Sequence, residues 1–294
     1  MMDYLVSERG SKMKLCSIEV NASPCVGALT EGGIVNLTAL GFPGRMNDFI
    51  AGGEEMRRRA EEALCGESLT FLREESVTFL PVTEPKKILC KGLNYKKHAE
   101  EAGKAAPEYP VFFNKFLDAL SGEGEAVTLP TWQKHYDYEA ELVIVVGKAA
   151  YNVSAAEAEG YIFGYTCGND FSARDSQFLS SQWLAGKSFP GFAPVGPYIV
   201  TRDQFNPLES KAVFCEVNGT EVQSGETSDM IFPCHEIVSH ASRFFPLNPG
   251  DLIFTGTPPG VVMGKRVEEQ VWLKPGDVVK VTIEGIGTLT TPLV

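Results

Sequence analysis

The chain has 294 residues, of which 44% are hydrophobic and 22% are charged, and this balance argues against an extended disordered protein. Its formal net charge is −12, and its basic residues cluster only at Arg57, Arg58 and Arg59, which argues against nucleic acid and anionic membranes as partners. The composition therefore favours a globular protein that acts on a small molecule.

The first residues, "MMDYLVSERGSKMKL", mix charged and apolar side chains and lack the apolar segment of a secretion signal. No later stretch approaches the ~20 consecutive apolar residues of a membrane-spanning helix. The seven cysteines are widely spaced and never form a Cys-x-x-Cys pair, a pattern typical of reduced thiols rather than disulfides or zinc ligands. We therefore predict a soluble, cytoplasmic protein.

The first part of the chain predicts a small α+β domain, residues 1–82. The apolar runs "KLCSIEV", "CVGALT" and "GIVNLTAL" indicate short strands, and the charged run from Asn47 to Leu64 indicates a helix. A further strand-like run, "SVTFLPV", precedes the turn residues "TEPKK". We place the boundary there, so that a second domain comprises residues 83–294.

The second domain contains many short apolar runs that glycine and proline interrupt, which is typical of a β-barrel or β-sandwich. Asn218-Gly219 predicts a tight hairpin, and Pro-Gly-Asp at 249–251 and at 275–277 each precede a strand. Helices are predicted only after the capping box Ser154–Glu157 and over residues 235–245. The predicted fold class is therefore α+β, mainly β.

Two glutamates precede and begin the apolar run "ELVIVVG". In a strand, Glu139 and Glu141 share one face, and water at a strand end or a hard cation could each explain such a pair. Asp170 ends the run "FGYTCGND", which we expect to neighbour the first strand, although Asp170 could instead cap a helix. Three carboxylates favour Mg²⁺ or Mn²⁺, with Ca²⁺ as a further oxygen-preferring candidate.

Several ordered segments together resemble the fumarylacetoacetate hydrolase family, from about residue 80 to the end. They are "LNYKKHAEEAG", "YEAELVIVVGK", "GYTCGNDFSARDSQ", "GKSF", "APVGPYIVT", "VNGTEVQSGETSDMIF", "GDLIFTGTPPGV" and "EGIGTL". The resemblance implies a homodimeric enzyme with a β-rich catalytic domain and a divalent metal that chelates a 2-oxo acid or 1,3-dicarbonyl substrate. It also implies that Glu139, Glu141 and Asp170 are the metal ligands.

The same resemblance implies roles for five further residues. His98 and Glu101 match a His-x-x-Glu dyad that activates water, although a surface helix would also explain this spacing. Lys187 in "GKSF" matches a lysine that stabilises an enolate or oxyanion. Gln177 and Thr257 match substrate-contacting positions, for which packing and a strand-ending turn are the alternatives. We further predict that residues 94–110 form a lid that is mobile without ligand.

The chain departs from the family pattern at two positions. Pro190 follows "GKSF" where many relatives have Asp, and Phe116 follows Lys115 where they usually have Pro. We expect both residues near the edge of the substrate site, where they would affect specificity rather than metal binding.

These residues allow several reactions through one metal-stabilised enolate. We favour hydrolysis of a C–C bond in an acylpyruvate-like or fumarylacetoacetate-like substrate, because the dyad can activate water. Decarboxylation of a β-keto acid such as oxaloacetate and keto–enol isomerisation need the same ligands and lysine. A metal-dependent binding protein without turnover is an alternative of another class.

Overall fold

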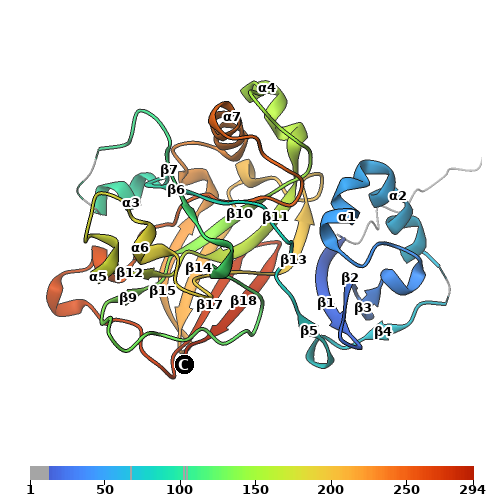
Figure 1. The fold of residues 1–294 in the computed structure, drawn as a ribbon, viewed down its shortest axis with the longest axis horizontal. Helices are drawn as coiled ribbons and strands as arrows, with labels where there is room; N and C mark the ends of the chain where they lie inside the picture. The colour runs from blue at the N-terminus through green and yellow to red at the C-terminus, as the bar shows by residue number, and fades with distance from the viewer. Residues whose placement is uncertain (1–12, 67, 102, 104) are drawn as a thin grey trace, which may run out of the picture.

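The computed structural model describes residues 13–66, 68–101, 103 and 105–294. Residues 1–12, which bear on the predicted absence of a secretion signal, lie outside the described part. Figure 1 shows the N-terminal strands and helices as a unit beside a larger, sheet-rich body. None of the described helices is both long enough and apolar enough to cross a membrane.

The largest sheet has twelve strands. Their bounds are β1 Lys14–Val20, β2 Ser23–Thr30, β3 Gly33–Asn36, β4 Phe71–Leu72, β5 Thr78–Phe79, β6 Ile88–Gly92, β7 Val111–Lys115, β8 Leu120–Ser121, β10 Ala140–Val146, β11 Ile162–Asn169, β13 Ala193–Thr201 and β16 Leu252–Phe254. Ten of them follow the order β4-β3-β2-β1-β13-β11-β10-β16-β6-β7. Because this path ends at β4 and β7 within the described residues, the sheet is open and does not close into a barrel, which leaves the sandwich of the two predicted alternatives.

A four-stranded sheet, ordered β15-β14-β17-β18, packs on the large sheet as the second layer of a sandwich. Its strands are β14 Ala212–Val217, β15 Thr220–Glu226, β17 Val278–Ile283 and β18 Gly287–Pro292, and a further pair joins β9 Tyr136–Asp137 to β12 Ser172–Ala173. The predicted hairpin at Asn218-Gly219 and the strands after both Pro-Gly-Asp turns are confirmed. The sandwich and the predicted fold class are confirmed with them.

Helices are few and mostly short. The α-helices are α1 Met46–Ala51, α2 Gly53–Leu64, α3 Lys96–Glu101, α4 Ala155–Ala158, α5 Arg174–Gln177, α6 Leu184–Lys187 and α7 Cys234–Phe244. Single 3-10 turns cover Thr38–Leu40, Glu74–Ser76, Leu117–Ala119, Glu159–Tyr161, Pro207–Glu209, Thr227–Asp229, Val262–Gly264 and Val267–Glu269. The single helix predicted over 47–64 is two helices, because the chain turns at Gly53, where φ is +63°.

Strand β10 lies at the centre of the fold and is buried on both faces. Leu142 and Ile144 contribute to the hydrophobic cluster between the two sheets. Val143 and Val145 belong to a second cluster on the other face, which also contains Phe49 of the N-terminal unit. This alternation explains why the sequence of β10 is almost continuously apolar. It also places odd-numbered residues of β10 on the face away from the four-stranded sheet.

The N-terminal unit joins the large sheet directly. Strand β1 pairs antiparallel with β13, so that Leu15 lies opposite Ile199. In Figure 1 this contact is where the blue unit meets the main body. The domain boundary between residues 82 and 83 stays a prediction.

Candidate metal centre

Two carboxylates stand together at the start of β10. Glu139 directly precedes the strand and Glu141 is its second residue, so both project from one face. Glu139 is 8% exposed, Glu141 is 2% exposed and Asp170, directly after β11, is 0% exposed. Solvation at a strand end is therefore the wrong explanation for the glutamate pair, since buried charges need partners in the protein or a bound cation.

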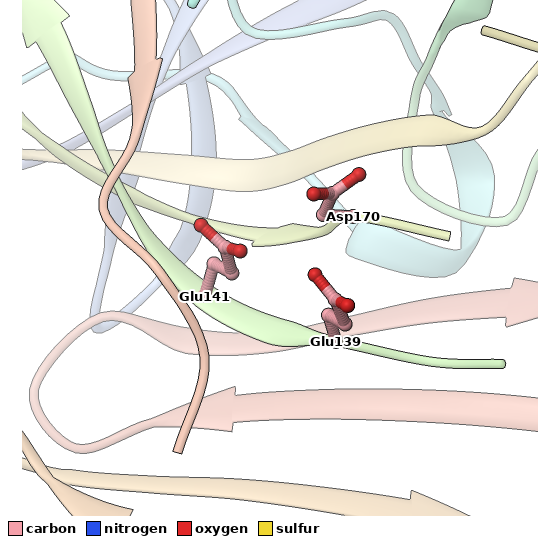
Figure 2. A group of neighbouring side chains, drawn as sticks. All are labelled: Glu139, Glu141 and Asp170. Carbon is pink, nitrogen blue, oxygen red and sulfur yellow. The ribbon is translucent and has the colours of Figure 1, made fainter. Parts of the chain in front are cut away.

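The pairing of β10 with β11 brings Asp170 to the glutamates. Glu141 lies opposite Gly168, and the N–H of Asp170 donates to the carbonyl of Glu139 at 2.9 Å. One possible ligand atom of each acid lies within 4.8 Å of the others, and Figure 2 shows the three carboxylates converging. The alternative that Asp170 caps a helix is wrong, because Ala173 is the N-cap of α5.

Three buried cations hold two of these carboxylates. Lys187 Nζ donates to Glu139 Oε2 at 2.8 Å and to Asp170 Oδ2 at 2.7 Å. Arg174 Nη2 donates to Glu139 Oε1 at 2.7 Å, and Lys115 Nζ lies 2.5 Å from Asp170 Oδ1. The structure thus places Lys187 beside the acids, as predicted, and adds Arg174 and Lys115.

Glu141 lacks such support. Its Oε2 accepts the N–H of Gly256 at 2.6 Å, and no lysine or arginine of the described residues forms an ion pair with it. Burial, and then the negative charges of Asp170 and Glu139, raise the pKa of Glu141 well above its usual range. Burial acts in the same direction on Glu139, but the charges of Lys187 and Arg174 outweigh it and lower the pKa of that carboxyl.

The donor set fits a divalent cation. All three groups offer oxygen, and Mg²⁺, Mn²⁺ and Ca²⁺ prefer oxygen ligands. A bound cation would supply the positive charge that Glu141 lacks. Three protein ligands also leave coordination positions for water and substrate. Glu139, Glu141 and Asp170 would therefore hold the metal.

The stability of the metal-free protein is expected to depend on Glu141. Because its pKa is raised, the folded state keeps a proton that the unfolded chain releases above pH about 4.3, so the free energy of unfolding should fall as pH rises through and beyond that value. The variant Glu141→Gln carries no titratable proton there and should show a weaker fall. Melting temperatures in chelator from pH 5 to 8 test this, and identical slopes for both proteins would contradict it.

The predicted dyad also lies at this site. His98 Nδ1 is 3.2 Å from Glu101 Oε2 on helix α3, and their side chains are 12% and 20% exposed. The N–H of Gly260 donates to Glu101 Oε1 at 3.0 Å. A solvated surface helix is therefore the wrong explanation for this spacing. The mobility of residues 94–110 stays a prediction, and positions 102 and 104 of that segment lie outside the described residues.

One cavity of about 380 Å³ joins these groups. It is lined by the three acids, His98, Glu101 and Lys187, and also by Gln177 and Thr257. Both of the latter already have partners in the protein. Thr257 Oγ1 donates to the carbonyl of Ala140 at 2.9 Å, and Gln177 Oε1 accepts from Arg174 at 2.7 Å. Their predicted contact with substrate stays a prediction.

The two departures from the family pattern lie elsewhere. Phe116 and Pro190 together line a different surface hollow, with Leu184 and Phe189, and neither lines the cavity of the acids. Phe116 is 55% exposed. Neither residue therefore lines the cavity of the acids, and their expected effect on specificity stays a prediction.

Asp137 and Arg174 form a connection that the sequence analysis missed. Asp137 is fully buried and accepts from Arg174 Nε at 3.0 Å and Nη2 at 2.8 Å. It also accepts the N–H groups of Val262 at 2.8 Å and Met263 at 3.1 Å. One signal was available, since Asp137 continues the i, i+2 series of Glu139 and Glu141. No comparable pattern marked Arg174, whose long side chain reaches the acids from α5.

Comparison with known proteins matches residues 87–294 to the family described as fumarylacetoacetate (FAA) hydrolase, C-terminal. A mitochondrial oxaloacetate tautomerase of Xenopus laevis is 38% identical over 278 residues, covering 92% of this chain and 86% of that protein. The fumarylacetoacetate hydrolase from psychrophilic Exiguobacterium antarcticum superimposes with a TM-score of 0.85 at 32% identity, covering 96% of this chain and 99% of that one.

A third relative carries ligands. Maleylpyruvate hydrolase from Sphingobium sp. SYK-6, in complex with manganese(II) and pyruvate, has a TM-score of 0.79 at 27% identity, covering 96% of this chain and 99% of that one. The family match spans most of the chain, and these relatives cover nearly all of it. The chain is therefore an enzyme of the fumarylacetoacetate hydrolase family.

Proposed function

We propose that this enzyme converts a 2-oxo acid or 1,3-dicarbonyl substrate into its enol form, with Mg²⁺ or Mn²⁺ held by Glu139, Glu141 and Asp170. The observation that carries the proposal is that these buried acids and the His98–Glu101 pair line one cavity. A divalent cation bound there supplies Lewis-acid polarisation of the keto oxygen. The relative that contains manganese(II) and pyruvate, a 2-oxo acid, supports this choice.

The residues of the chain would divide the remaining work. The contact with Glu101 orients the imidazole of His98 through Nδ1, which leaves Nε2 to take a proton from the carbon beside the keto group. Lys187 would stabilise the developing oxyanion. Burial lowers the pKa of Lys187, but the charges of Asp170 and Glu139 raise it more, so this side chain stays a cation.

Keto–enol tautomerisation is the first candidate for the net reaction. It moves one proton from the carbon next to the keto group to the keto oxygen and breaks no carbon–carbon bond, and the relative from Xenopus laevis is named an oxaloacetate tautomerase. Hydrolysis of a C–C bond, which the sequence analysis favours, is the second candidate. The oriented His98 could activate water instead, and another relative is named a maleylpyruvate hydrolase. Decarboxylation of a β-keto acid uses the same acids without activated water.

The test compares three reactions in one preparation. Deuterium uptake at the third carbon of oxaloacetate and 2-oxobutanoate reports enolisation, acetate release from acetylpyruvate reports hydrolysis, and pyruvate release from oxaloacetate reports decarboxylation. Each reaction is measured again after a chelator has removed the metal, and once more after Mg²⁺ or Mn²⁺ has been added back. Uptake that requires metal, with no cleavage, supports tautomerisation, while metal-dependent cleavage supports hydrolysis. Metal-dependent binding without any turnover would leave the chain a binding protein and overturn the proposal.

The expectations on assembly and location stay predictions. A homodimer would appear as twice the mass of one chain in solution scattering. The named oxaloacetate tautomerase relative is mitochondrial, so the predicted cytoplasmic location needs direct localisation of the full chain.

A further inference from the structure

Part of the cavity plays no role in holding the metal or in the dyad. Six apolar side chains line it beside the charged groups, and we call them the apolar wall: Leu93, Phe113, Phe178, Trp183, Val261 and Met263. Pockets for small molecules combine such apolar lining with few polar groups, and the apolar part decides which substituents fit.

The apolar wall begins next to the candidate metal ligands. Lys187 Nζ, which contacts Glu139 and Asp170, also lies 5.2 Å from the centre of the Phe113 ring. The Phe113 ring packs edge-on against Trp183, with ring centres 5.4 Å apart. A group attached to a 2-oxo acid at the metal would therefore meet aromatic surface directly.

The wall is both fixed and accessible. The Trp183 ring packs on the backbone of Gly92, where a Cβ atom would come within 2.7 Å of it. Toward solvent, Phe178 is 52% exposed and Met263 is 38% exposed. Large apolar side chains that gather at the rim of a pocket typically become covered when a ligand binds. A ligand with an apolar substituent would cover them.

The apolar wall itself offers no cation for a second carboxylate, because all six of its side chains are apolar. Among the described residues that line the cavity, Lys187 and Arg174 are paired with the acids. Lys91 is 1% exposed, and its Nζ donates to the carbonyl of Gly92 at 2.6 Å. A distal carboxylate on the apolar wall would lose its hydration without gaining a partner.

We infer that the enzyme selects 2-oxo acids whose third carbon carries an apolar, preferably aromatic, substituent over those with a second carboxylate there. The inference rests on the proposed function for its chemistry, since the wall binds only the part of the substrate that does not react. It names a substrate class that differs from oxaloacetate, the substrate in the name of the tautomerase relative.

Three substrates with the same 2-oxo acid group test the inference. Deuterium uptake at the third carbon of phenylpyruvate, pyruvate and oxaloacetate is measured with the Mn²⁺-loaded enzyme, after subtraction of the uncatalysed rate. We expect kcat/KM for phenylpyruvate to exceed the other two values by about tenfold or more, as a well-filled aromatic pocket provides. Higher kcat/KM for oxaloacetate than for phenylpyruvate would overturn the inference while leaving the proposed function in place.

Variants of Phe178 test whether the apolar wall causes the preference for phenylpyruvate. Phe178 is half exposed, so Phe178→Ala should fold normally, and it should reduce kcat/KM for phenylpyruvate about tenfold more than kcat/KM for pyruvate. Phe178→Lys should lower the KM for oxaloacetate by supplying the missing cation. The control is Phe244→Ala, at an exposed phenylalanine of α7 outside the cavity. Equal losses on phenylpyruvate and pyruvate would overturn the inference.

Binding separates failure of the inference from failure of the proposed function. If no substrate takes up deuterium, the proposed function fails, and calorimetry with the Mn²⁺-loaded protein then decides the inference. Tighter binding of phenylpyruvate than of pyruvate, lost in Phe178→Ala, would uphold the apolar wall as a binding site. Equal affinities for the two acids would overturn it.

Discussion

Replacing Glu141 with glutamine is expected to remove the metal from the enzyme. The amide keeps the shape of the side chain but cannot supply the charged oxygen that a divalent cation needs. Groups outside the ligand shell already change metal affinity by about 10–100-fold, so loss of a ligand should weaken Mn²⁺ binding more than about 100-fold. Calorimetric titration of the chelator-treated protein measures the affinity, and turnover should fall to background.

Glu123→Gln is the matched control for this change. Glu123 is a half-buried carboxylate that accepts the N–H of Thr290, and it lies outside the cavity. Its replacement should leave Mn²⁺ affinity unchanged. Full activity of Glu141→Gln at a metal concentration that just saturates the wild type would show that Glu141 is not a ligand.

Replacing His98 with alanine should damage proton transfer and leave the metal in place. General acid–base groups contribute about 10²–10⁴-fold to rate, so deuterium uptake and acylpyruvate hydrolysis should both fall by a factor in that range. Metal affinity should not change, because His98 contacts Glu101 rather than the three acids. Oxaloacetate decarboxylation, which needs no activated water, should survive.

The control for this variant is His240→Ala, since His240 of helix α7 packs against Phe232 and lies outside the cavity. Glu101→Gln should show part of the same loss, because the amide can still contact the imidazole but orients it without a charge. Unimpaired uptake and hydrolysis in His98→Ala would remove this residue from the mechanism. A parallel loss of Mn²⁺ affinity would instead make it a support of the metal site.

Local patterns in the sequence predicted the elements that carry the site. The two-residue period of a strand placed Glu139 and Glu141 on one face, and adjacency of sequential strands brought Asp170 to them. The dyad was implied by the resemblance to the family, and the three-residue spacing on a helix placed its two side chains on one face. Each of these predictions depends on spacing within one element or on the pairing of consecutive strands, so it could be made from the sequence.

Other features depend on contacts between distant parts of the chain. The pairing of β1 with β13, which adds the N-terminal strands to the large sheet, joins segments whose sequences give no sign of each other. Arg174 and Lys115 reach the acids through long side chains whose direction depends on the surrounding packing. Phe116 was expected near the substrate because it replaces the usual proline of the family pattern, but β7 ends at Lys115 and the Phe116 side chain is exposed to solvent.

The hydrogen bonds of Asp137 have a thermodynamic consequence. Arg174 donates hydrogen bonds to both Asp137 and Glu139. Asp137 also accepts the N–H groups of Val262 and Met263, and the N–H of Gly260 in the same segment donates to Glu101. Metal affinity and substrate affinity are then linked quantities, and linkage is reciprocal. Whatever factor a bound cation adds to substrate affinity, a bound substrate adds to cation affinity. The enzyme would therefore release its metal most readily when the cavity is empty.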